Sequence, residues 1–301
     1  MRGRPTRTWT GCSTPSTSCA RGEAARPRRP HARRPTTGLG SRAMDGLRLT
    51  WKWRVIAALT VTFVRSQRWR VRVEGLEHVP GRGGAVLAFN HHSYLDFVML
   101  GWAPVLRLRR PVRFLAKREI WASRWVGWLV RWAEAVPVDR RSATARGSAY
   151  QAAIDALTQG DLVAVAPEQT ISPSFDLLPF RTGAVRMAQQ AGVPIVPTVG
   201  WGTHRFATKG HRPRWRSRLP VVVHYGPPIE VGPDEDAVEA TARVEAAMTA
   251  LLDEVQRGYE DGTPAGAWWV PARLGGSAPP HAQVLAEHLD RARRWQERGG
   301  D

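Results

Sequence analysis

Short apolar runs alternate with longer amphipathic segments along most of the 301-residue chain. Short runs bounded by Gly, Pro or charged residues are typical of buried strands, whereas apolar positions that recur every three or four residues indicate helices. Strands are predicted at residues 71–73, 85–89, 112–115, 135–138, 162–166, 195–199 and 221–225. Helices are predicted at residues 93–102, 120–132, 143–158, 183–190 and 234–257. This alternation predicts the α/β fold class, with a mostly parallel sheet flanked by helices.

Residues 55–64 (VIAALTVTFV) form the longest apolar stretch after Met44. A helix that crosses a bilayer needs about 20 such residues, so this stretch is too short to span one. Tryptophan and basic residues flank it on both sides, at Trp51, Lys52, Trp53, Arg54, Arg65, Arg68 and Trp69. Two interpretations stay open: an amphipathic helix that lies in a membrane interface, or a buried core helix with an amphipathic edge.

A second segment rich in tryptophan lies in the helix predicted at residues 120–132. Its tryptophans recur at helical spacing beside two arginines, at Trp121, Trp125, Trp128 and Trp132 with Arg124 and Arg131. An ordinary core stripe is one interpretation, but four large rings in a row pack poorly in a core. The pattern therefore favours a membrane interface, where an indole ring is amphipathic and arginine reaches lipid phosphate.

Charge is unevenly distributed along the chain. Lys and Arg number 44 against 26 Asp and Glu, which gives a formal net charge of +18. The first 43 residues hold ten Arg and one Glu, so half of this excess lies in a leader that also contains five prolines and both cysteines. We expect the leader to be disordered and to reflect a mis-assigned translation start, with Met44 as the true start. The remaining chain lacks the cysteines for a disulfide or for cysteine-ligated zinc.

A basic excess of this size indicates an anionic partner, which can be nucleic acid, a membrane surface or a phosphorylated substrate. A nucleic-acid-binding protein is the less favoured class, because half of the excess lies in the leader and no recognised nucleic-acid module occurs in the sequence. We therefore expect an anionic membrane surface, and no nucleic acid, as the macromolecular partner.

Potential catalytic side chains gather at residues 90–96 (NHHSYLD), where an apolar strand is predicted to end and a helix to begin. Active sites of open α/β sheets lie at such carboxyl ends of strands. His91 can act as a general base if Asp96 accepts from one ring nitrogen and leaves the other free. Alternatively, Ser93 and Asp96 form a capping box that serves only the helix. A metal site through His91, His92 and Asp96 is disfavoured, because adjacent histidines usually point apart.

The motif at residues 90–96 resembles the NHxSxxD block of the glycerolipid acyltransferases, a family that includes the lysophosphatidic acid acyltransferases. Four further blocks follow in the family's order and spacing. They lie at residues 114–119 (FLAKRE), 136–140 (VPVDR), 166–172 (APEQTIS) together with 179–183 (PFRTG), and 193–197 (VPIVP). The resemblance covers about residues 71–230, and its strength comes from five blocks in order.

The resemblance implies direct acyl transfer from acyl-CoA or acyl carrier protein to the hydroxyl of a lysophospholipid at the cytoplasmic face of the cell membrane. The expected acceptor is 1-acyl-glycerol 3-phosphate, and neither a metal nor a further cofactor is implied. His91 is then the base and Asp96 holds its imidazole. Substrate-binding residues are implied at Lys117, Arg140, Glu168, Thr170 and Arg181, with supporting residues at Asn90, Ser93 and Gly183.

The third block of the family usually contains Gly, Thr and Arg in succession. Here Gln169 stands at the Gly position and Ile171 at the Arg position. Either Arg181 and Lys117 supply the missing charge, or the acceptor is a lipid other than 1-acyl-glycerol 3-phosphate. A catalytically inactive lipid-binding relative is a further alternative, against which the intact His–Asp pair argues. The segments WGT and TKG, within residues 201–210, could line the site, but the sequence favours turns for both.

The expected organisation has four parts: a leader at residues 1–43, a membrane-interface helix at 44–70, an acyltransferase domain at 71–260, and a C-terminal arm and helix at 261–301.

Overall fold

The computed structural model of the protein describes residues 50–117, 122, 127–132, 135–138, 143–215 and 217–297. The leader lies outside these residues, so its disorder stays a prediction. The same holds for most of the Trp-rich segment. Trp121 and Trp125 lie outside the described residues, as does the side chain of Trp128.

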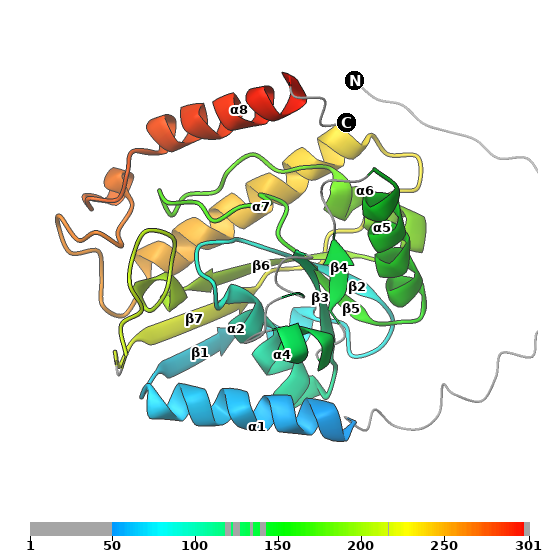
Figure 1. The fold of residues 1–301 in the computed structure, drawn as a ribbon, viewed down its shortest axis with the longest axis horizontal. Coiled ribbons are helices and arrows are strands. Elements are labelled where there is room, and N and C mark those ends of the chain that lie inside the picture. The colour runs from blue at the N-terminus through cyan, green and yellow to red at the C-terminus, as the bar shows by residue number, and fades with distance from the viewer. Residues whose placement is uncertain are drawn as a thin grey trace, which may run out of the picture. The chain divides into compact units, whose positions relative to one another are not determined.

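A seven-stranded sheet runs through the described part of the chain, with the strand order β1-β7-β6-β2-β5-β3-β4 (Figure 1). The strands are β1 (Arg70–Glu74), β2 (Ala85–Phe89), β3 (Val112–Lys117), β4 (Val136–Val138), β5 (Leu162–Val165), β6 (Ile195–Trp201) and β7 (Pro220–Tyr225). Neighbouring strands are parallel except for β6 and β7, which are antiparallel. The mostly parallel sheet predicted from the sequence is confirmed.

Helices cover both faces of this sheet. They are α1 (Trp51–Ser66), α2 (Asp96–Ala103), α4 (Gly127–Trp132), α5 (Ala143–Thr158), α6 (Gly183–Ala191), α7 (Ala237–Arg257) and α8 (His281–Glu297), and a π-helical turn (Pro104–Leu108) follows α2. In Figure 1, α1 runs along one side of the sheet and α7 along the other. Among the described residues, no helix combines the length and the apolar character that crossing a membrane requires.

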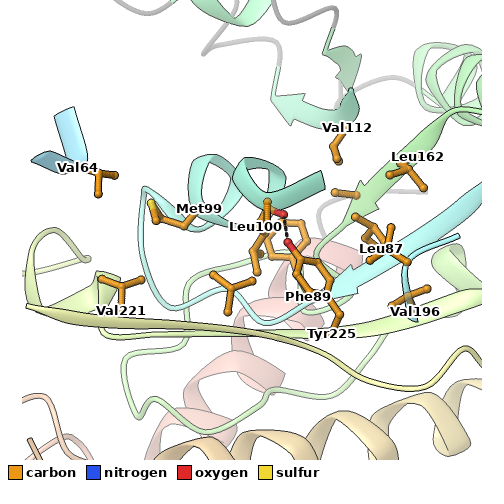
Figure 2. Packing of buried hydrophobic residues seen from close by; sticks show 14 of the residues in the cluster. Val64, Leu87, Phe89, Met99, Leu100, Val112, Leu162, Val196, Val221 and Tyr225 are labelled. Atoms are coloured by element: carbon orange, nitrogen blue, oxygen red, sulfur yellow. Dashed lines mark hydrogen bonds between the residues drawn. The ribbon is translucent and has the colours of Figure 1, made fainter. Parts of the chain in front are cut away.

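Two apolar layers hold the helices on the sheet. The first, shown in Figure 2, is one cluster that includes Val64 of α1, Met99 of α2 and Leu87 of β2. In the second, Val86 of β2 packs with α5, α6 and Met248 of α7. Successive side chains of a strand point to opposite faces, so β2 contributes to both layers and is buried along its whole length. Its carboxyl end, where the motif at residues 90–96 begins, is therefore fixed from both sides.

The inner and outer faces of α1 differ in what they contact. Trp53 and Ala57 are buried, whereas Val55 and Leu59 are exposed. At the start of the helix, the exposed ring of Trp51 packs edge-on against Trp132 of α4, with ring centroids 5.1 Å apart. The core interpretation therefore describes the inner face of α1, and the exposed apolar positions of the outer face leave the membrane interpretation as a prediction.

After α7 the chain folds back over one end of the sheet. Trp269 and Val270 are buried there against Trp201 of β6. The amphipathic helix α8 follows and ends the described part of the chain.

Candidate active site

His91 and Asp96 meet at the carboxyl end of β2. His91 lies just after the strand, and Asp96 is the first residue of α2. Nδ1 of His91 lies 3.3 Å from Oδ2 of Asp96. The Asp96 side chain is fully buried, whereas 25% of the His91 side chain is exposed. The buried carboxylate can therefore hold Nδ1 while Nε2 is left to receive a proton from a bound hydroxyl.

The carboxylate of Asp96 is held by three further donors. Oδ2 accepts the backbone N–H groups of His92 and Ser93, both at 2.7 Å, and Oδ1 accepts the hydroxyl of Thr203 at 2.8 Å. The capping and catalytic interpretations are thus compatible, because one carboxylate serves both. The helix begins three residues later than predicted, since Ser93 directs its hydroxyl to the carbonyl of Ala207 at 2.8 Å.

Asn90 joins the end of β2 to β6. Its Oδ1 accepts the backbone N–H of Gly200 at 2.7 Å, and its Nδ2 donates to the carbonyl of the same residue at 3.0 Å. Nδ2 also lies 3.0 Å from Nδ1 of His92, whose ring packs among Phe175 and Trp201 in the interior. Burial lowers the pKa of His92 to about 4, so this ring is neutral at pH 7. Asn90 thus fixes the end of β2 against β6, and its supporting role in the reaction stays a prediction.

Glu168 is buried beneath the His–Asp pair. Its Oε1 accepts the backbone N–H of His91 at 2.8 Å, and its Oε2 accepts that of Leu178 at 2.9 Å. Burial raises the pKa of Glu168 to about 8. With both oxygens bound to backbone amides, this side chain acts on the position of His91. The substrate-binding role that the resemblance implies for Glu168 stays a prediction.

At the position where the family has glycine, the third block takes a backbone conformation that glycine favours. Gln169 adopts a φ of 59°, in the left-handed region that glycine enters without strain. Thr170 is half-buried, and Ile171 is 7% exposed, so position 171 faces the interior. Arg181 is exposed, and its backbone N–H donates to the carbonyl of Pro167 at 3.1 Å.

The remaining predicted site residues are placed only in part. Gly183 begins α6, and Lys117 ends β3 at the same edge of the sheet as His91. The side chain of Lys117 and the whole of Arg140 lie outside the described residues. Their contact with a substrate phosphate stays a prediction.

An apolar cavity of about 300 Å³ lies beneath α1, and its walls include Leu95 and Phe97, the neighbours of Asp96 in the chain. Its walls come from α1, α2, the π-helical turn and β3, and they include Trp53, Ile56, Ala57, Phe63, Leu95, Phe97, Trp102 and Phe114. Phe89 connects it to the site, because its ring contacts both Phe114 and the ring of His91, at centroid distances of 6.4 and 6.1 Å. This cavity was not predicted from the sequence, although the amphipathic pattern of residues 51–66 and the aromatic residues at 89, 97 and 114 were visible signals.

Comparisons with known proteins show what this chain is similar to. A family model described as acyltransferase matches residues 70–201, the segment that contains His91, Asp96 and Glu168. A 1-acyl-sn-glycerol-3-phosphate acyltransferase of Bacillus subtilis is 30% identical over 139 residues, which cover 46% of this chain and 66% of the relative. The enzyme of the same name from Limnanthes douglasii is 33% identical over 162 residues, which cover 53% of this chain and 54% of the relative. The alpha form from Bos taurus is 34% identical over 187 residues, with coverage of 62% and 64%.

A solved structure shows the same fold. The crystal structure of the 1-acyl-sn-glycerophosphate (LPA) acyltransferase PlsC from Thermotoga maritima matches with a TM-score of 0.56 and 24% identity, over 69% of this chain and 81% of that chain. The matches to the curated relatives above span between about half and two thirds of their length. Residues 70–201 match the acyltransferase family model, and the five sequence blocks follow in the order of the glycerolipid acyltransferases, which this part of the chain therefore resembles.

Proposed function

We propose that the protein transfers a fatty acyl group from an acyl thioester, carried by coenzyme A or acyl carrier protein, to the free hydroxyl of a lysophospholipid. The observation that carries this proposal is the His91–Asp96 pair, partly open to solvent, at the side of a cavity that is almost entirely apolar. A base beside an apolar cavity is what the transfer of an acyl chain to an alcohol requires.

The reaction follows from the two ring nitrogens of His91. The acceptor hydroxyl gives its proton to Nε2 while its oxygen attacks the thioester carbonyl, and Asp96 stabilises the imidazolium through Nδ1–H. The tetrahedral adduct then collapses with cleavage of the C–S bond, and the thiolate leaves with the proton held on Nε2. A thioester is already activated, so the protein mainly supplies a base and orientation, and no covalent enzyme intermediate is needed.

The cavity supports the binding of a hydrocarbon chain next to this base. Each methylene buried in such an environment contributes about 0.8 kcal/mol, so a chain several carbons long gains substantial binding free energy. Since Phe89 joins the cavity wall to His91, a chain that fills the cavity brings its polar end toward the imidazole.

For the acceptor we propose 1-acyl-glycerol 3-phosphate, with phosphatidic acid as the product. The curated relatives carry the name of this reaction. Arg181 is exposed on the segment that folds against the third block, where it can meet a phosphate. The buried Ile171 cannot contribute to such a contact, so the phosphate depends on Arg181, Lys117 and Arg140.

Such acceptors reside in bilayers, and the outer face of α1 supports peripheral attachment to one. Trp51 and Val55 are exposed on this face at 62% and 37%, and Arg54 lies exposed beside them. We place the protein at the cytoplasmic face of the membrane, where both acyl donors occur.

The test is product identification. Purified protein is incubated with labelled acyl-CoA, or with acyl carrier protein loaded with the same chain, and with a panel of lysophospholipids, and products are identified by mass spectrometry. We expect labelled phosphatidic acid as the main product. A diacyl phosphodiester formed equally well would change the proposed acceptor, and the absence of any acylated lipid would contradict the proposed function.

A further inference from the structure

Residues 209–215 (KGHRPRW) form a loop between β6 and β7, which we call the basic loop. All seven residues are exposed, and the side chain of Trp215 is 67% exposed. The loop holds three cations, Lys209, Arg212 and Arg214, and the sequence has no acidic residue between Asp176 and Glu230. The loop therefore presents uncompensated positive charge next to a large exposed ring.

The base of the basic loop is fixed at both ends. On the side of β6, the hydroxyl of Thr208 donates to the carbonyl of His92, in the catalytic motif, at 2.6 Å. On the side of β7, the hydroxyl of Ser217 accepts from the indole N–H of Trp69, just beyond the end of α1, at 3.0 Å. The loop thus connects the catalytic motif to the helix that covers the apolar cavity.

The two rings of the loop pack on aromatic neighbours, and the ring of His211 stacks on Trp268 with centroids 3.9 Å apart. The ring of Trp215 contacts Phe206 and Phe63 edge-on, at centroid distances of 5.3 and 6.4 Å, which leaves most of its surface in solvent. Lys209, Arg212 and Arg214 form no side-chain hydrogen bond or ion pair with any part of the chain that the structure describes. A solvated lysine or arginine is common, but three cations beside an exposed tryptophan on one short loop are not explained by folding.

We propose that the basic loop binds the anionic surface of a lipid bilayer, with the ring of Trp215 in the headgroup region and its three cations at lipid phosphates. An indole ring prefers the boundary between headgroups and acyl chains, and basic residues are attracted by the negative potential of anionic lipids. A soluble phosphate would engage the cations alone and leave Trp215 in water. A lipid surface engages both.

This inference rests on the proposed function only in expecting a substrate that resides in a membrane. It adds a contact separate from α1. Because Thr208 bonds the backbone of the catalytic motif, a bilayer held by this loop lies against the same end of the sheet as His91. The loop would therefore bring the base to the surface from which the acceptor comes.

Vesicle binding tests the proposal without requiring turnover. The full chain is sedimented with vesicles of phosphatidylcholine alone and of phosphatidylcholine with phosphatidylglycerol, at low and high salt. The variant Arg212→Gln/Arg214→Gln is compared with Arg82→Gln/Arg293→Gln, which removes the same charge from exposed positions elsewhere. We expect the first variant to lose about tenfold or more in its partition onto anionic vesicles, and the control to bind like the unmodified protein.

The variant Trp215→Ser separates the apolar contribution to vesicle binding from the electrostatic one. We expect it to weaken binding to both kinds of vesicle. Equal binding by the two double variants would overturn the proposal. So would a raised KM of the loop variant for monomeric short-chain substrates with unchanged vesicle binding, because that result would assign the loop to a substrate phosphate. If the protein proved to have no acyltransferase activity, the vesicle result would still stand on its own.

Discussion

Asp96 performs two tasks with one carboxylate. Its Oδ2 accepts from the backbone amides of His92 and Ser93 and lies within 3.3 Å of Nδ1 of His91. Its Oδ1 is occupied by Thr203. The sequence presented the helix start and the catalytic pair as alternatives because spacing alone cannot show which atoms of a side chain are used. A residue that holds both the imidazole and the turn around it can be changed only at the expense of both.

The first prediction concerns Asp96→Asn. An amide nitrogen at the position of Oδ2 would face two backbone donors, whereas one at the position of Oδ1 would lose only the bond from Thr203. Loss of such a buried hydrogen bond costs about 1–3 kcal/mol of unfolding free energy. We expect a lower kcat with little change in KM, and a smaller loss than for removal of His91. Steady-state kinetics with chemical denaturation of the same samples measures both effects, and Thr203→Val serves as the comparison that spares Oδ2. Unchanged kcat in Asp96→Asn would contradict the role assigned to the carboxylate.

The second prediction concerns Glu168 and pH. Burial raises its pKa from 4.5 to about 8, so the native state holds a proton that the unfolded state loses across this range. The unfolding free energy therefore decreases as pH rises from 4.5 to about 8. His92, with its pKa lowered from 6.5 to about 4, has the opposite effect below pH 6.5, so the slope due to Glu168 is clearest between pH 6.5 and 8. One titrating group can change the unfolding free energy by at most about 1.4 kcal/mol per pH unit.

Denaturant unfolding across this pH range measures the slope. We expect Glu168→Gln to remove it, whereas Glu239→Gln, a change at an exposed position of α7, should retain it. The same slope in all three proteins would show that Glu168 is not the group that titrates.

At the scale of elements, the sequence succeeds where the signal is local. The strand at residues 85–89 and the helix at 143–158 have the predicted bounds, because Gly and polar residues punctuate an uninterrupted pattern. β6 extends to Trp201, two residues beyond its predicted end, because it pairs with β7 from Thr198 to Trp201. That pairing depends on a strand about twenty residues away. The cavity could not be predicted for a similar reason, since its walls come from four elements that meet only in the fold.

The third prediction uses the two faces of α1. Ala57 lies on the wall of the cavity, and Ala58 is exposed on the other face of the same helix. Ala57→Phe should fill part of the cavity and shift the preference toward shorter acyl chains. Each methylene that no longer fits lowers kcat/KM by about fourfold, which corresponds to about 0.8 kcal/mol. Competition assays with substrates of increasing chain length measure the shift. Ala58→Phe adds the same ring on the outside and should leave the chain-length profile unchanged, and an identical shift in both variants would exclude the cavity as the chain-binding site.

At the scale of the whole molecule, the sheet explains why distant parts of the sequence meet. β2, β3, β5 and β6 run in the same direction, so the segments that follow them lie at one edge. His91 follows β2, Glu168 follows β5, and Thr203 follows β6. The order of the blocks along the chain predicted His91 and Asp96 as the catalytic pair, and the fold brings these two side chains within 3.3 Å of each other. The order of the blocks could not reveal that Glu168 contacts the backbone of His91, because that contact depends on the separation of two loops in space.

The most direct test of this account is the rate of acyl transfer by His91→Ala. A general base contributes about 10²–10⁴-fold, and the acceptor hydroxyl has no other base assigned to it. We predict a loss of this size in kcat/KM, with the circular dichroism spectrum and the unfolding midpoint close to those of the unmodified protein. His224→Ala, on β7, provides the matched control and should retain activity. Full turnover by a well-folded His91→Ala protein would contradict the account at its centre.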